Sequence, residues 1–229
     1  MSTRPTKNVA IDPVTIIIKE CVSISTAMRK YSKISSQSGV AALLAGGGDV
    51  FHNQDGSMAD TFNSLSTHKN NDPFLSGFIQ LRLMLNKLNT LDDIDSLTVL
   101  QPFLLVVSTN TISGYITSLA LDSLQRFINL SVIDQHSMNY VNAYRGLINA
   151  LTHCRFEASE QISDDSVLLK VVMLLNSIIS SPVSDYLSDS IMYDAIQTTM
   201  SLACNKRRAD ILKKAAESTM MSITLKVFG

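Results

Sequence analysis

Cysteine is scarce in this chain of 229 residues, which has only Cys21, Cys154 and Cys204, placed far apart. An odd number of widely spaced cysteines argues against a disulfide framework and favours free thiols in a reducing compartment. The stretch 1–12 is polar and lacks the apolar core of a secretory signal. We therefore expect a cytoplasmic protein with a flexible N-terminal arm over residues 1–12.

Charge and long apolar runs are also in short supply. Only 17% of the residues are charged and the net charge is -1, so no global field draws the chain toward nucleic acid or an anionic membrane. A spanning helix needs about 20 apolar residues, whereas Lys19 and Glu20 end the apolar run from Val14 to Ile18. The sequence predicts no nucleic-acid partner and a membrane contact that is peripheral at most.

Apolar side chains are what the sequence has in abundance. The hydrophobic fraction is 45%, and a globular chain of this size buries roughly 70% of the surface that its unfolded form exposes. Such a chain folds without metals or disulfides. The apolar excess predicts a large core, a buried partner surface, or both, and the 10 methionines suit irregular gaps in that core.

The apolar residues recur at helical spacing through most of the chain. A first amphipathic helix is predicted to begin after Asp12 as N-cap, with Pro13 at the first helical position, and to continue as far as Leu44. Asp72-Pro73 repeats this start before a second helix. The two apolar stripes consist of Val14, Ile17, Cys21, Ile24, Met28 and Tyr31, and of Phe74, Phe78, Leu81, Leu85 and Leu88.

Further helices follow at short intervals. The segment 97–107 is apolar nearly all round, which predicts a buried central helix with Pro102 in its first turns. Others are predicted over about 113–128, 141–151, 163–178, 188–202 and 207–228. No segment alternates like a strand. The predicted fold is therefore all-α, an armadillo- or HEAT-like stack of about eight or nine helices, with a compact irregular bundle as the alternative.

The connection between the first two helices differs from the others in composition. Gly46-Gly47-Gly48 is expected to stop the first helix, and a stretch rich in Asn, Ser, Asp and His extends from there to residue 71. The glycines lack the ending of a phosphate loop and follow no predicted strand. We expect a mobile insert over about 46–71, within a single helical domain over 13–229.

Residues able to do chemistry are scattered along the chain. The four histidines stand at no metal-ligand spacing, and the neighbours His153 and Cys154 point different ways on a helix. His153 is expected to interact with carbonyls at the end of its helix instead. The sequence predicts no catalytic residue, no cofactor and no metal site, which favours a binding or structural protein.

Two polar clusters have simple explanations. The basic residues Lys206-Arg207-Arg208 and Lys213-Lys214 are diluted by acids and interleaved with no aromatics, so we expect a solvated helix face. In the run Ser163-Asp164-Asp165-Ser166, Ser163 is the expected N-cap and the acids complement the helix dipole. Neither cluster points to catalysis.

Four segments resemble one protein family. They are 71–81, 100–107, 113–127 and 149–170, and the patterns Ile116-Thr-Ser-Leu-Ala-Leu121 and Thr152-His-Cys-Arg-Phe156 are specific in combination. The segments resemble the N-terminal dimerisation and cyclophilin-binding (DCB) domain of the large Arf guanine-nucleotide exchange factors. The Golgi branch is the most similar, and the fungal Gea type within it. The resemblance covers almost the whole chain.

The resemblance implies a right-handed armadillo-like stack and a non-catalytic regulatory role. The parent protein would activate Arf in vesicle trafficking at the Golgi, while the exchange domain lies outside this segment. The implied work of the domain is self-association as a homodimer, contact with the adjacent homology-upstream domain, and docking of Arf-like or Rab GTPases and Golgi membrane proteins. The protein would then be cytoplasmic and cycle to Golgi membranes.

The resemblance also assigns two residues. In the Golgi branch, dimerisation has been tied to a basic residue in the helix that matches Leu124–Phe127 and to an acidic residue at the helix start that matches Ser163–Ser166. These positions correspond to Arg126 and Asp165. An arginine–carboxylate pair across a protomer boundary would give register and specificity. The alternatives are an exposed arginine and a dipole-complementing acid, or a monomeric helical-repeat adaptor that binds a small GTPase or a peptide.

Overall fold

The computed structural model describes residues 12–38, 72–88, 91 and 94–228. Within these ranges the chain forms eight α-helices and one short 3-10 helix, and no strand is assigned. The helices are α1 (Pro13–Ser38), α4 (Pro73–Leu85), α5 (Ser96–Ser108), α6 (Gly114–Asn129), α7 (Tyr140–Thr152), α8 (Gln161–Ile179), η1 (Pro182–Tyr186), α9 (Asp189–Cys204) and α10 (Asp210–Phe228).

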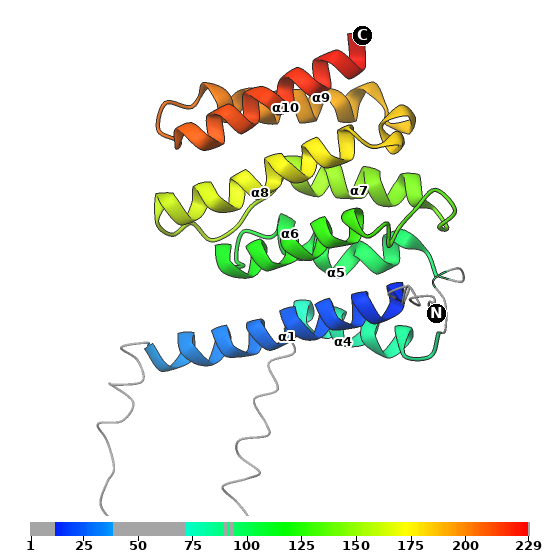
Figure 1. Ribbon diagram of the computed structural model, residues 1–229. Helices are drawn as coiled ribbons and strands as arrows, with labels where there is room; N and C mark the ends of the chain where they lie inside the picture. Colours follow the sequence, from blue (N-terminus) through cyan, green and yellow to red (C-terminus); the bar gives the residue numbers. More distant parts are fainter. Residues whose placement is uncertain (1–11, 39–71, 89–90, 92–93, 229) are drawn as a thin grey trace, which may run out of the picture.

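The helices pair and stack in chain order. Figure 1 shows the pairs α1/α4, α5/α6, α7/α8 and α9/α10 one above another, with the last pair at the top. In one layer α1 is followed by α6, α8 and α10, and in the other α4 is followed by α5, α7 and α9. This arrangement confirms the predicted all-α helical stack. The predicted arm and the predicted insert over 46–71 lie outside the described residues, apart from Asp12.

One hydrophobic core extends from α1 to η1. At its centre Phe103 of α5 makes edge-to-face contacts with Phe78 of α4 and Phe127 of α6, each at 5.1 Å between ring centroids. Such pairs stabilise a core beyond the area that they bury. The pair α9/α10 is attached by two smaller clusters, one around Ile179 and Ile223 and the other around Val172, Leu212 and Ala216.

The predicted aspartate-plus-proline helix starts are confirmed. The carboxylate of Asp12 accepts from Val14 N at 3.2 Å and Thr15 N at 3.1 Å, and that of Asp72 accepts from Phe74 N at 3.0 Å. Each carboxylate thereby satisfies amide groups that the first helical turn leaves without an intrahelical partner. Both starts depend only on neighbouring residues, which is why the sequence pattern indicates them.

Three other features of the helices differ from the prediction: the position of Pro102, the burial of α5 and the start of α10. Pro102 is the seventh residue of α5, past the first turn. It faces Gly77 of α4, where an added Cβ would lie 3.7 Å from the Cβ of Pro102. Helix α5 is also not buried all round, because Leu105 is 42% exposed. Helix α10 begins at Asp210 rather than Arg207, so the basic run 206–208 lies in the turn after α9 and not on a helix face.

Candidate functional site

Asp165 is buried inside its own chain. It is the fifth residue of α8 and only 6% exposed. Its Oδ1 accepts from Arg208 Nη1 at 2.8 Å, and its Oδ2 accepts from the backbone N–H of Ala209 at 2.7 Å. Asp165 therefore anchors the α9–α10 turn to α8. The prediction that it only complements the helix dipole is wrong.

The start of α8 differs from the prediction. Ser163 was the expected N-cap, but the N-cap residue is Glu160, three residues earlier, and α8 begins at Gln161. The side chain of Asp164 reaches back to the N–H of Ser159 at 3.1 Å, which secures the chain ahead of the helix. Asp165 lies seven residues before Val172, so both are on the face of α8 that packs against α10.

Arg126 lies in the last turn of α6 and also has a partner within the chain. Its Nη1 donates to Oε1 of Glu20 on α1 at 2.7 Å, while Ser123 donates to Oε2 of the same carboxylate at 2.8 Å. Glu20 is 4% exposed, so these bonds satisfy a buried charge. The side chain of Arg126 remains 57% exposed, which leaves several guanidinium N–H groups open to a second acceptor.

Arg126 and Asp165 do not meet within one chain. Helices α6 and α8 run parallel, since Ser118 bonds Lys170 near one end and Gln125 bonds Ser177 near the other. Arg126 is therefore near the C-terminal ends of these two parallel helices, and Asp165 is near their N-terminal ends. Their contact across a protomer boundary stays a prediction.

A third ion pair, which the sequence did not indicate, lies between these two. Lys170 Nζ of α8 donates to Asp122 Oδ2 and to Ser118 Oγ of α6, each at 2.7 Å. Successive elements of the layer are thus joined by Glu20–Arg126, Asp122–Lys170 and Asp165–Arg208. Each joins acid and base far apart in sequence, which no local pattern can reveal.

The segments 113–127 and 149–170, which carry the two specific sequence patterns, meet in space. After α7 the chain crosses the α5–α6 turn, where Glu157 N donates to Ile112 O at 2.7 Å and Glu157 forms a bridge with Ser113. A Cβ added to Gly114 would lie 3.3 Å from Cδ2 of Phe156. The glycine that opens α6 therefore makes room for the phenylalanine that ends the second pattern.

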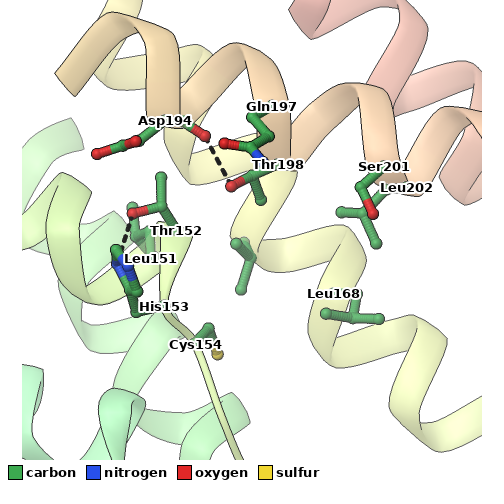
Figure 2. Close-up of a pocket in the computed structure, with 11 residues that line it drawn as sticks. Leu151, Thr152, His153, Cys154, Leu168, Asp194, Gln197, Thr198, Ser201 and Leu202 are labelled. Atoms are coloured by element: carbon green, nitrogen blue, oxygen red, sulfur yellow. Dashed lines mark hydrogen bonds between the residues drawn. The ribbon is translucent and has the colours of Figure 1, made fainter. Parts of the chain in front are cut away.

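A polar groove of about 370 Å³ lies between the end of α7 and α9 (Figure 2). Thr152, His153 and Cys154 line one side, and α9 contributes Asp194, Gln197, Thr198 and Ser201. Burial raises the pKa of the Cys154 thiol to about 12, so almost no thiolate forms near neutral pH. His153 Nδ1 lies 3.0 Å from the Asn149 carbonyl, which confirms its predicted role at the helix end.

The described ranges offer little chemistry beyond these contacts. No group of three potential metal-binding side chains is found in them, and all three cysteines are free. No helix among the described residues has the length and apolar character needed to cross a bilayer. What the described residues offer is helix surfaces, the groove between α7 and α9, and one ion-paired layer, which suit binding.

Comparison with known proteins identifies the family of this chain. Residues 65–229 match the family of Mon2/Sec7/BIG1-like dimerisation and cyclophilin-binding (DCB) domains. The chain is 68% identical over 221 residues to ARF guanine-nucleotide exchange factor 2 of Saccharomyces cerevisiae, a match that covers 96% of this chain and 15% of that protein. It is 53% identical over 219 residues to ARF guanine-nucleotide exchange factor 1 of the same yeast, covering 96% of this chain and 16% of that protein.

More distant relatives share part of the chain. The identity is 32% over 163 residues with the Golgi-specific brefeldin A-resistance guanine nucleotide exchange factor 1 homolog of Caenorhabditis elegans, covering 71% of this chain and 8% of that protein. The chain thus spans about 15% of the length of the yeast exchange factors that it matches. The family match covers most of the chain, and the chain belongs to the DCB domain family of Mon2/Sec7/BIG1-like proteins.

Proposed function

We propose that this chain is the non-catalytic regulatory and dimerisation domain of an Arf guanine-nucleotide exchange factor that acts in Golgi vesicle trafficking. The observation that carries the proposal is the DCB family match over residues 65–229, together with yeast relatives named as Arf exchange factors. The exchange activity itself belongs to another part of such a protein. This domain contributes self-association and partner contacts, and is cytoplasmic, cycling to Golgi membranes.

Arg126 is the residue that we propose faces the second protomer. Its guanidinium is half-exposed and has free donors beyond the bond to Glu20. Asp165 is buried and held by Arg208, so direct pairing with a partner's arginine would require it to leave that contact. We therefore propose that Asp165 supports the interface by fixing the α9–α10 turn, while Arg126 contacts the partner directly.

Light scattering coupled to size-exclusion chromatography tests the dimer. We expect a dimer for the wild-type chain and a monomer for Arg126→Met. Glu20→Gln removes the internal partner but keeps the arginine, so it should remain dimeric if Arg126 acts across the interface. Arg145→Glu on α7, in the other layer, is the control for a surface charge change.

Two results would contradict the proposed interface. One is a wild-type chain that stays monomeric at high concentration. The other is a dimer that Arg126→Met leaves intact while circular dichroism shows a native helical signal. If Glu20→Gln and Arg126→Met lose the dimer equally, the internal ion pair rather than a direct contact is what matters.

Contact with the adjacent homology-upstream domain is a further part of the proposal. Among the described residues, the last helix pair has only one neighbouring pair in the stack. Apart from Ile211 at the start of α10, its large exposed apolar residues are Tyr193, Met200, Met221, Leu225, Val227 and Phe228. Helical-repeat stacks need a polar outer face where they end. This apolar surface supports packing of further helices against α9 and α10. Calorimetric titration with the homology-upstream domain should lose most of its heat for Met221→Glu with Leu225→Glu.

Arf-like or Rab GTPases and Golgi membrane proteins are the proposed recruiting partners. The alternative function is a monomeric helical-repeat adaptor for a small GTPase or a peptide, and the polar groove between α7 and α9 supports it. A pulldown with GTP-loaded and GDP-loaded Golgi GTPases separates the two. Retention of the GTP form by a strictly monomeric chain, lost on Asp194→Ala with Gln197→Ala, would favour the adaptor.

A further inference from the structure

The first turns of α8 and α10 lie side by side at one edge of the stack, on the left in Figure 1. A groove of about 880 Å³ runs between them. It is lined by the isoleucines Ile162 and Ile211 and by the basic residues Lys206, Arg207 and Lys213. We refer to these five residues as the basic edge.

The two isoleucines project into solvent. Ile162 is 85% exposed and Ile211 is 67% exposed, although each begins a helix that is buried on its other face. Single exposed apolar residues are normal on a protein surface. Two isoleucines on neighbouring turns beside the same groove form an apolar pair that neither helix uses for its own packing.

The charges around the isoleucines favour an anionic partner. The carboxylate of Asp165 is bound by Arg208, and that of Asp210 by Lys213 at 3.1 Å. Lys206 and Arg207 are both exposed and form no ion pair among the described residues. Among the carboxylates of the described groove lining, only Glu160 likewise has no ion pair. The lining therefore has more cationic side chains than carboxylates.

We propose that the basic edge docks directly on an anionic bilayer surface. The isoleucines enter the interfacial layer of the bilayer, and Lys206 and Arg207 meet the phosphates of anionic headgroups. Apolar side chains flanked by lysine and arginine are the combination that binds such interfaces, because apolar burial and attraction to anionic lipid add together. The inference deepens the membrane recruitment in the proposed function and requires neither the dimer nor a GTPase.

The basic edge is held together by bonds between the α9–α10 turn and α8. Both isoleucines are at helix starts next to connecting turns, and the Asp165 contacts to Arg208 and Ala209 hold the α9–α10 turn against α8. Gln161 adds a bond from its side-chain amide to the Arg207 carbonyl. These bonds hold the α9–α10 turn against α8, beside the groove that both isoleucines line.

Vesicle sedimentation with the 229-residue chain tests the inference. The chain should bind vesicles of phosphatidylcholine with phosphatidylserine and not vesicles of phosphatidylcholine alone. Ile162→Ser with Ile211→Ser should lower the partition coefficient about tenfold, and Lys206→Glu with Arg207→Glu should abolish binding. Met138→Ser with Tyr193→Ser removes residues of comparable exposure, 54% and 63%, far from the edge, and should bind like the wild type.

Three outcomes would overturn the inference. They are no binding of the wild type to anionic vesicles, equal binding to neutral and anionic vesicles, and equal loss in the edge variant and its control. Vesicle binding that needs the cations but not the isoleucines would contradict the entry of the isoleucines into the bilayer. Light scattering on the same samples separates failure here from failure of the proposed dimer.

Discussion

At the scale of single residues, two buried acids set how the layers are joined. Glu20 and Asp165 are 4% and 6% exposed, and each has an arginine and a second donor as partners. A buried carboxylate is tolerated when its hydrogen bonds are complete, and removing one partner leaves a costly buried charge or donor. The side-chain identities were visible in the sequence, but their burial was not.

Asp165→Asn is expected to lower the free energy of unfolding by on the order of 3 kcal/mol, because Arg208 loses its charged acceptor in a largely buried site. Urea denaturation followed by circular dichroism measures this change. Asp122→Asn is the matched control. The side chains of Asp122 and Lys170 are 41% and 32% exposed, so loss of their ion pair should lower the free energy of unfolding by less than about 1 kcal/mol. Equal losses in the two variants would contradict the assigned anchor.

The cysteines should differ sharply in reactivity. Burial raises the pKa of Cys21 and of Cys154 to about 12, whereas Cys204 is exposed. Since the thiolate is the reactive form, iodoacetamide at neutral pH should modify Cys204 first and leave the other two until the chain unfolds. Peptide mass spectrometry reads out the sites, and early modification of Cys21 would contradict its burial.

The same raised pKa values predict a loss of stability in alkali. In the unfolded chain these thiols ionise near their ordinary pKa of 9.0, whereas in the folded chain they stay protonated to about 12. The unfolded state therefore binds fewer protons between these values, and stability falls as pH rises from about 9 toward 12. Urea midpoints across this range should fall less steeply for Cys21→Ala with Cys154→Ala than for the wild type.

At the scale of helices, local rules decided some boundaries and neighbours decided others. The Asp12 and Asp72 caps act within three residues and were predicted. The predicted N-cap of α8 was wrong by three residues, since Asp164 secures Ser159 and the helix extends ahead of the expected Ser163 cap. The start of α10 was wrong because Ala209 just before it is held by Asp165, 44 residues away in sequence.

Asp72→Ala is expected to destabilise the chain by about 1 kcal/mol, because the amide of Phe74 loses its acceptor at the start of α4. Asp72→Ser keeps a capping oxygen, so it should lower the free energy of unfolding by only a few tenths of the loss expected for Asp72→Ala. Thermal and urea unfolding measure both variants. If serine and alanine destabilise equally, the side-chain bond does not hold this helix start.

At the scale of the whole molecule, the core is unevenly distributed. A continuous core joins α1 to η1, while α9 and α10 are attached mainly by two small clusters and the Asp165 anchor. Ile191 of α9 also packs against the main core, and Lys226 of α10 pairs with Asp185 of η1. Segments with fewer buried apolar contacts open locally at lower free energy than the core. The last helix pair is therefore the part of the described stack best suited to rearrange when a partner binds.

Hydrogen–deuterium exchange should show this gradient. Amides of α9 and α10 are expected to exchange faster than those of α5 to α8, and Asp165→Asn should accelerate exchange in α10 selectively. Binding of the homology-upstream domain should slow exchange in the same two helices. Uniform protection along the stack would contradict a weakly attached last pair.

The sequence by itself determined the all-α class, the aspartate-plus-proline helix starts, the His153 contact and the family, because these depend on periodicity, near neighbours and short patterns. Tertiary structure alone decided that Asp165 is an internal anchor, that Arg126 pairs with Glu20, and that the two isoleucines share one edge. Those facts join positions from 43 to 106 residues apart. Only packing of the layers brings such positions together, because helical periodicity specifies which face is buried but not which helix covers it.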